Sequence, residues 1–245
     1  MIGLNTKYLF FDIDGTLAHG GGVVTDANKE AILKVQALGH KVFLNTGRSL
    51  ANIPSATLNS IKWDGIVAGT GYVEYGGQVL YLKPMPAPAL EEIYDYCTEK
   101  DVDCLFEGVD KLYTNRHNDW SDFIADHTPF SDEMKVTNVT VGAPLPEGDL
   151  ARFEQVKIVR MPDYFEANNL GHGKDTGIRI IEEHCGIKNE DTLAFGDSMN
   201  DLEMLQYAGT SVVMASAPEE LRSIADICAT EKDGVAEALR IIFGI

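Results

Sequence analysis

The first 82 residues alternate between continuous apolar runs and segments whose apolar residues recur at helical spacing. Continuous runs are typical of parallel strands covered on both faces, and the second pattern is typical of the helices that cover them. We expect strands at residues 8–11, 41–48 and 65–71, and helices at residues 25–39 and 49–61, the second kinked or broken at Pro54. Residues 72–82 predict a hairpin that turns at Gly76 and Gly77.

The pattern changes after Leu82, where three prolines fall within residues 84–88. Beyond them we expect helices at 88–99 and near 119–126, and strands at 102–107, 111–115, 135–141 and 156–161. Strict alternation returns from Lys174, with helices at 175–185, 200–208, 218–225 and from 235, and strands at 192–197, 211–215 and 226–230. These patterns predict an α/β fold: a doubly wound, mostly parallel sheet built from residues 1–82 and 168–245, with an inserted α/β domain at residues 83–167.

Composition and charge narrow the classes of partner. Of the 245 residues, 44% are hydrophobic, which allows a sizeable core. The formal net charge of −18, from 38 acids and 20 bases, argues against a nucleic acid or an anionic membrane as partner, but not against a small anion in one cleft. The sequence has no apolar run near 18 residues and no secretory pattern, so we expect a cytoplasmic protein with four reduced cysteines.

The candidate chemistry begins with Asp12 and Asp14, which directly follow the first strand. Carboxylates two residues apart on an extended chain lie on one side, within about 7 Å, and repel each other unless a cation sits between them. Ligands bind beyond the carboxyl ends of the strands of such a sheet. The polar residues that follow strands, or begin a helix at that edge, are Asp12, Asp14, Thr46, Gly47, Arg48, Lys174, Asp197, Asn200 and Asp201. Together they outline a site for Mg²⁺ and a phosphate group.

These residues carry a family resemblance. The runs DIDGTL (12–17), Thr46-Gly47, Lys174 and GDSMND (196–201) are similar, in order and spacing, to the four motifs of the haloacid dehalogenase (HAD) superfamily. The chain most resembles its Cof-type branch of Mg²⁺-dependent phosphatases, which carry an α/β cap of the C2 type at the position of the insertion. It departs from that branch at residues 69–72 and 214–217, and at Asp175, where a glycine is usual.

The resemblance implies a phosphoaspartyl mechanism. Asp12 would attack phosphorus, and Asp14 would protonate the leaving oxygen and then deprotonate the attacking water. The metal would be held by the Asp12 carboxylate, the Asp14 carbonyl and Asp197, with Asp201 in support through water. The phosphate would be bound by Thr46, Gly47, Lys174 and Asn200. Each motif alone has a structural explanation, such as a turn, a solvated lysine or a first-turn acid, and it is their joint occurrence at successive strand ends that favours catalysis.

The sequence therefore predicts a phosphoric monoester hydrolase with Mg²⁺ as cofactor and a small phosphorylated metabolite, by analogy a sugar phosphate, as substrate. A phosphomutase, which returns the phosphoryl group to the bound sugar, is the enzymatic alternative. A phospho-accepting signalling domain is the non-catalytic alternative, against which the Asp14 acid/base and the large cap argue. The oligomeric state cannot be read from the sequence.

Overall fold

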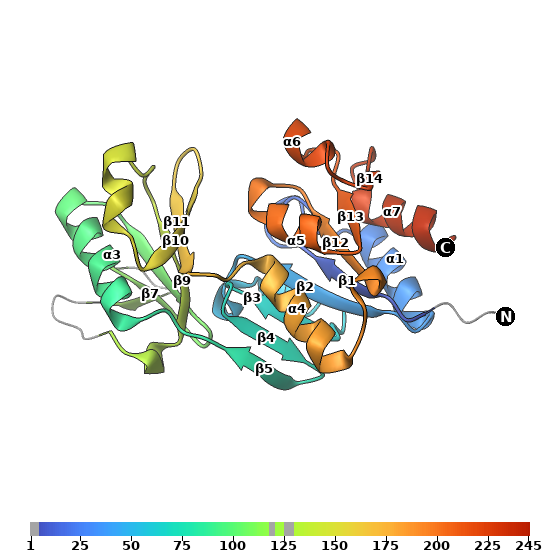
Figure 1. Ribbon diagram of the computed structural model, residues 1–245, viewed down its shortest axis with the longest axis horizontal. Coiled ribbons are helices and arrows are strands. Elements are labelled where there is room, and N and C mark those ends of the chain that lie inside the picture. Colours follow the sequence, from blue (N-terminus) through green and yellow to red (C-terminus); the bar gives the residue numbers. More distant parts are fainter. Residues whose placement is uncertain (1–4, 118–120, 125–129) are drawn as a thin grey trace.

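The computed structural model describes residues 5–117, 121–124 and 130–245, and the chain forms two lobes, each built on its own sheet (Figure 1). In the described part of the chain, eight strands form the first sheet, in the order β14-β13-β12-β1-β2-β3-β4-β5. Their bounds are β1 Tyr8–Phe11, β2 Lys41–Thr46, β3 Gly65–Ala68, β4 Tyr72–Tyr75, β5 Gln78–Leu82, β12 Thr192–Gly196, β13 Thr210–Val213 and β14 Ile227–Cys228. The strands from β14 to β3 are parallel, and only β4 and β5 pair antiparallel. This is the mostly parallel sheet that the sequence predicts.

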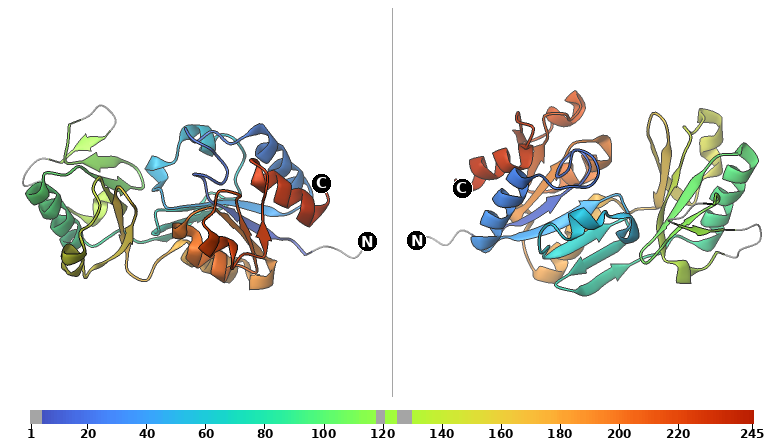
Figure 2. Two further views of the ribbon diagram at one scale, coloured as in Figure 1. Left: turned by 90° about the horizontal axis from the view of Figure 1, so that it is seen from above. Right: turned by 180° about the vertical axis from the view of Figure 1, so that it is seen from behind.

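Helices cover both faces of this sheet, and the alternation of side chains along β1 shows how. Leu9 and Phe11 pack against α1 (Asp26–Ala37) and α7 (Gly234–Phe243), which lie side by side. Figure 2 shows these two helices on one side of the strands. Phe10 points to the opposite face and joins the core formed with α4 (Lys174–Cys185), α5 (Leu202–Tyr207) and α6 (Glu219–Arg222). Because β1 is covered on both faces, all its central side chains are apolar.

Local signals in the first segment set the bounds of its elements, and those at Pro54, Gly76 and Gly77 act as the sequence predicts. Thr25 caps α1 by accepting a hydrogen bond from the Asn28 N–H, at 3.3 Å. Pro54 divides the second helical stretch into a 3-10 helix, Leu50–Asn52, and the short α2, Ser55–Leu58. Gly76 and Gly77, both with positive φ, form the turn between β4 and β5.

A second, mainly antiparallel sheet lies between β5 and α4 in the sequence. Among the described residues its strand order is β10-β11-β9-β6-β7-β8, with only β7 and β8 parallel. The strands are β6 Cys104–Gly108, β7 Leu112–Thr114, β8 Asp122–Phe123, β9 Val136–Val141, β10 Val156–Arg160 and β11 Phe165–Asn169. Helix α3 (Ala87–Lys100) covers one face, with Leu90 and Ile93 packed into a core shared with Phe106 and Phe165. Further 3-10 helices are Asp132–Met134, Glu147–Arg152, Asn189–Asp191 and Met199–Asp201.

Two expectations for the insertion need correction. Residues 165–169 were not expected to form a strand, yet they form β11, which pairs with both β9 and β10 and crosses the expected boundary at residue 167. The sequence FEANN has weak strand propensity, and the two neighbouring strands impose the conformation. The helix expected near residues 119–126 is also wrong where it can be checked, because Asp122 and Phe123 form β8. Its remaining positions fall partly outside the described residues.

Two simpler features complete the description. The four cysteines are unpaired, as expected. Among the helices formed by the described residues, none combines the length and apolar character required to cross a bilayer.

Candidate active site

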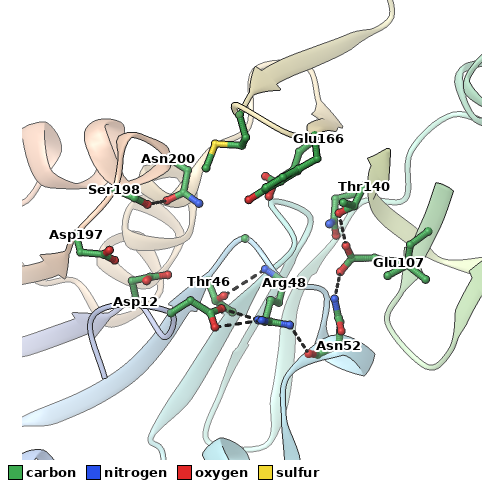
Figure 3. Close-up of a pocket in the computed structure, with 16 residues that line it drawn as sticks. Asp12, Thr46, Arg48, Asn52, Glu107, Thr140, Glu166, Asp197, Ser198 and Asn200 are labelled. Carbon is green, nitrogen blue, oxygen red and sulfur yellow. Dashed lines mark hydrogen bonds and ion pairs between the residues drawn. The ribbon is translucent and has the colours of Figure 1, made fainter. Parts of the chain in front are cut away.

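A cavity of about 430 Å³ lies between the two sheets, at the carboxyl ends of β1, β2 and β12. One wall consists of core residues, including Asp12, Thr46, Asp197 and Asn200. The opposite wall comes from the second sheet, including Glu107, Thr140 and Glu166 (Figure 3). The structure thus brings the polar residues from successive strand ends to one place, as the sequence predicts for a doubly wound sheet.

Asp12, which lines the cavity, belongs to a buried ion-pair network around Lys174. Its ammonium group lies 2.7 Å from Asp12 Oδ1, 2.5 Å from Asp201 Oδ1 and 3.3 Å from Asn200 Oδ1. Asp12, Lys174 and Asp201 are all at most 5% exposed. A buried charge of this kind is stable only when it is paired and hydrogen-bonded, so the lysine fixes the direction in which the Asp12 carboxylate points.

Asp201 has a different environment from the other acids. Its second oxygen, Oδ2, accepts hydrogen bonds from the backbone N–H groups of Asp197 and Ser198, at 2.9 and 3.1 Å. Both of its oxygens therefore already have partners, and the side chain is fully buried. Asp201 holds Lys174 on one side and the turn that carries Asp197 on the other.

Gly15 allows the chain to pass close to Asp197. Its φ of +87° is in the region that favours glycine, and an added Cβ would lie 2.2 Å from Asp197 Oδ2. The next residue, Thr16, donates a hydrogen bond from Oγ1 to Asp197 Oδ1, at 3.1 Å. The Gly-Thr pair that follows Asp14 thus positions an acid 181 residues further along the chain.

Asp14 and Thr46 are both tied to Arg48. The Asp14 side chain is half exposed and accepts two hydrogen bonds from the Arg48 guanidinium group, from Nε at 2.6 Å and from a terminal nitrogen at 3.1 Å. The Thr46 hydroxyl oxygen accepts a hydrogen bond from the Arg48 backbone N–H, at 3.2 Å. The sequence placed Arg48 in the polar run after the second strand, but nothing in that run identified Asp14 as its partner.

The electrostatics of the site favour a divalent cation. Carboxylate oxygens of Asp12, Asp197 and Asp201 all lie within 4.8 Å of one another. Burial raises the pKa of Asp12 to about 8, against the opposing effect of Lys174, and burial also raises the pKa of Asp197 to about 6, with a further contribution from Asp201. Three carboxylates and one ammonium group leave a charge of −2 when all are ionised. Hard oxygen donors with this excess charge suit Mg²⁺.

Sequence reasoning missed the residues that the second sheet contributes. Glu107 is buried on β6 and accepts hydrogen bonds from Ser49 N at 3.3 Å, Asn52 Nδ2 at 2.8 Å and Thr140 Oγ1 at 2.8 Å. Glu166, on β11, is half-buried, and burial raises its pKa, with a smaller contribution from Glu107. No motif marks either position, because each depends on the register of a separate sheet.

Comparison with known proteins agrees with this geometry. The sequence profile of haloacid dehalogenase-like hydrolases matches residues 9–141 and 151–239. A Bacillus subtilis protein named 5-amino-6-(5-phospho-D-ribitylamino)uracil phosphatase YitU is 26% identical over 96% of this chain and 96% of its own. A Methanospirillum hungatei protein named phosphoglycolate phosphatase is 28% identical over 95% of this chain and 94% of its own.

Comparison with solved structures also points to this family. The chain of the HAD subclass IIB sugar phosphatase BT4131 is 28% identical and superimposes with a TM-score of 0.85, over 98% of this chain and 100% of that one. The matched family profile covers both sides of the insertion and most of the insertion itself. On these grounds, the chain belongs to the haloacid dehalogenase-like hydrolase family.

Proposed function

We propose that the protein is a Mg²⁺-dependent phosphatase that hydrolyses a small phosphorylated metabolite through an aspartyl-phosphate on Asp12. The observation that best supports this is the buried Asp12–Lys174–Asp201 network, whose Asp12 lines a cavity with polar walls. The names of the relatives also support it, since each is called a phosphatase of a phosphomonoester or of a sugar. In this proposal the second sheet and α3, approximately residues 83–167, form the cap.

In the first step, an Asp12 oxygen attacks phosphorus as the bond from phosphorus to the leaving oxygen breaks. Asp14 gives its proton to that oxygen, so the alcohol leaves neutral. Lys174 directs Asp12 toward the substrate and offsets phosphoryl charge, while Thr46, Gly47 and Asn200 bind phosphoryl oxygens. Since a protonated Asp14 cannot keep its ion pair with Arg48, substrate binding must first release Asp14 from the guanidinium group.

In the second step, Asp14 takes a proton from a water molecule that attacks phosphorus, and the bond from phosphorus to Asp12 breaks. The products are inorganic phosphate and the original carboxylate. We assign the metal to the Asp12 carboxylate, the Asp14 carbonyl and Asp197, where Mg²⁺ would neutralise charge on the phosphoryl group. Asp201 supports this set indirectly, because both of its oxygens already bind Lys174 and backbone N–H groups.

Hydrolysis of p-nitrophenyl phosphate tests this proposal. We expect release of phosphate that requires Mg²⁺, stops on addition of EDTA, returns with Mg²⁺ and is inhibited by Ca²⁺. Rapid quenching with a radiolabelled substrate should trap the label on the wild-type protein and not on Asp12→Asn. Turnover that persists in Asp12→Asn would rule out the mechanism. Accumulation of an isomerised sugar phosphate without inorganic phosphate would point instead to a phosphomutase, and a long-lived phosphoprotein without turnover to a signalling domain.

A further inference from the structure

The cavity is more acidic than phosphate binding requires. Among the described residues, its lining includes five carboxylates and a single guanidinium group, and Asp14 already pairs with that group. Three of the carboxylates belong to the core wall, where Lys174 pairs with Asp12 and the metal ion of the proposed function would offset the remaining charge. The other two, Glu107 and Glu166, are on the cap wall and form no ion pair with a lysine or arginine in the described part of the chain. The alcohol half of a substrate bound through its phosphate would face these two.

The two cap carboxylates differ in how much of their hydrogen-bonding capacity is already used. Glu107 is 2% exposed and accepts three hydrogen bonds, two of them from the core residues Ser49 and Asn52. Its oxygens therefore serve to join the cap to the core and have little capacity left for a ligand. Glu166 is half-buried, and Asn168 on the same strand acts to lower its pKa against the rise that burial causes. A carboxylate can accept about four hydrogen bonds, so Glu166 retains the capacity to bind substrate.

Glu166 lies close to the end of the cavity where the reaction would take place. A Cβ on Gly47 would lie 3.9 Å from Glu166 Oε2 and 3.9 Å from Asn200 Nδ2. Gly47 follows Thr46 in the turn to which we assign phosphate binding. The Glu166 carboxylate thus reaches from the cap to the border between the phosphate half and the alcohol half of the cavity (Figure 3). A donor group near the ester oxygen would lie between two acceptors, the carboxylate and the phosphate.

We propose that Glu166 selects the alcohol half of the substrate: it accepts a hydrogen bond from a hydroxyl or ammonium group near the ester oxygen and repels a second anionic group there. The substrate class is then phosphomonoesters of polyols or amino alcohols, and phosphorylated acids are excluded. This inference rests on the proposed function. It separates this chain from its relative named phosphoglycolate phosphatase, because phosphoglycolate carries a carboxylate as a second anionic group beside its phosphate.

The test compares two substrates with one carbon skeleton, glycerol 3-phosphate and 3-phosphoglycerate, in which a carboxylate replaces a hydroxymethyl group. The repulsion between two unit charges about 6 Å apart, at an effective dielectric constant of about 20, lowers an equilibrium constant for binding by a factor on the order of 10². We therefore expect kcat/KM for glycerol 3-phosphate to exceed that for 3-phosphoglycerate by ~10²-fold in the wild type. In Glu166→Gln, which keeps the shape and removes the charge, the ratio should fall at least ~10-fold.

Two further variants make the result specific. Glu166→Asp keeps the charge and should keep most of the discrimination. Glu154→Gln removes an exposed carboxylate from the same lobe, outside the cavity, and should leave the ratio at its wild-type value. Equal kcat/KM for the two substrates in the wild type, or an unchanged ratio in a folded Glu166→Gln protein, would overturn the role of Glu166 and leave the phosphatase proposal intact. Failure of the wild type to hydrolyse these substrates and p-nitrophenyl phosphate alike would overturn both.

Discussion

The replacement Asp201→Asn distinguishes a metal ligand from a residue that positions Lys174. Asp201 accepts from the Lys174 ammonium group at 2.5 Å and from two backbone N–H groups at 2.9 and 3.1 Å, and it is fully buried. An asparagine amide has one acceptor oxygen and one donor nitrogen. Whichever way it turns, its NH₂ group must face either the ammonium group or the two N–H groups, all of which are donors.

The cost follows from those contacts. A hydrogen bond to a charged group contributes about 1.5–3 kcal/mol, and a buried donor left without a partner costs a further 1–3 kcal/mol or so. Reduced repulsion among the neighbouring carboxylates offsets part of this loss. We therefore expect the free energy of unfolding to fall by about 3 kcal/mol. At roughly 2–4 °C per kcal/mol for a chain of this size, the melting temperature should fall by about 6–12 °C.

Thermal unfolding followed by circular dichroism, together with p-nitrophenyl phosphate kinetics, measures both consequences. We expect kcat to fall at least ~10-fold, because Lys174 loses one of its two carboxylate partners, while the Mg²⁺ concentration for half-maximal activity stays within about threefold. The control is Glu30→Gln, which breaks an exposed ion pair with Lys34 and should not change the melting temperature. A melting temperature within about 2 °C of the wild type would refute the burial argument. An intact kcat with a Mg²⁺ requirement raised ~10-fold or more would show that Asp201 binds the metal directly.

Three other predictions follow from the same site. Asp12→Asn should lower kcat for p-nitrophenyl phosphate by at least ~10³-fold, and substantial residual turnover would contradict a role as nucleophile. Burial raises the pKa of Asp197 from about 4 in the unfolded chain to about 6 in the folded protein. In the metal-free protein, the stability that Asp197 contributes is therefore fully present below about pH 4 and is lost as the pH rises through about 6. Burial also raises the pKa of Asp12, the other carboxylate assigned to the metal, to about 8. Mg²⁺ affinity should accordingly rise with pH, by up to ~10-fold per pH unit for each carboxylate that is still protonated, and level off only above about pH 8. Titrations of Mg²⁺-induced thermal stabilisation at pH 5 and pH 7.5 check this, and equal affinities would contradict it. Gly15→Ala should lower activity by at least ~10²-fold, because the new Cβ would displace Asp197, whereas Gly20→Ala, with a similar φ but no atom within 4 Å of the added Cβ, should remain active in the same assay.

The core and its half of the site could be predicted because the signals are local. The acids, threonines and glycines that matter there lie at the end of an apolar strand or within a few residues of it, and parallel strands bring such positions to one edge. The other half of the cavity depends on pairing in the second sheet. Glu107 and Glu166 are on β6 and β11, which meet only through β9, where Asn138 pairs with Glu107 and Thr140 pairs with Glu166. That register depends on contacts between distant segments, and the sequence around Glu166 lacks the alternation that marks a strand.

The Arg48–Asp14 ion pair could not be predicted for a related reason. Two residues 34 positions apart meet because β1 and β2 are neighbours and the chain turns sharply after each of them. A doubly wound sheet was predicted, but the direction of a long side chain beyond a strand end depends on which acceptors the finished structure offers.

The position of β1 has a consequence for the synthesis of the protein. This strand lies between β2, made soon after it, and β12, which is made only after the whole of the second sheet. Asp12 likewise pairs with Lys174, which lies 162 positions further along the chain. A polypeptide that ends before Lys174 should therefore release no phosphate from p-nitrophenyl phosphate. Activity then reports that Lys174 and β12 have been made and have joined β1.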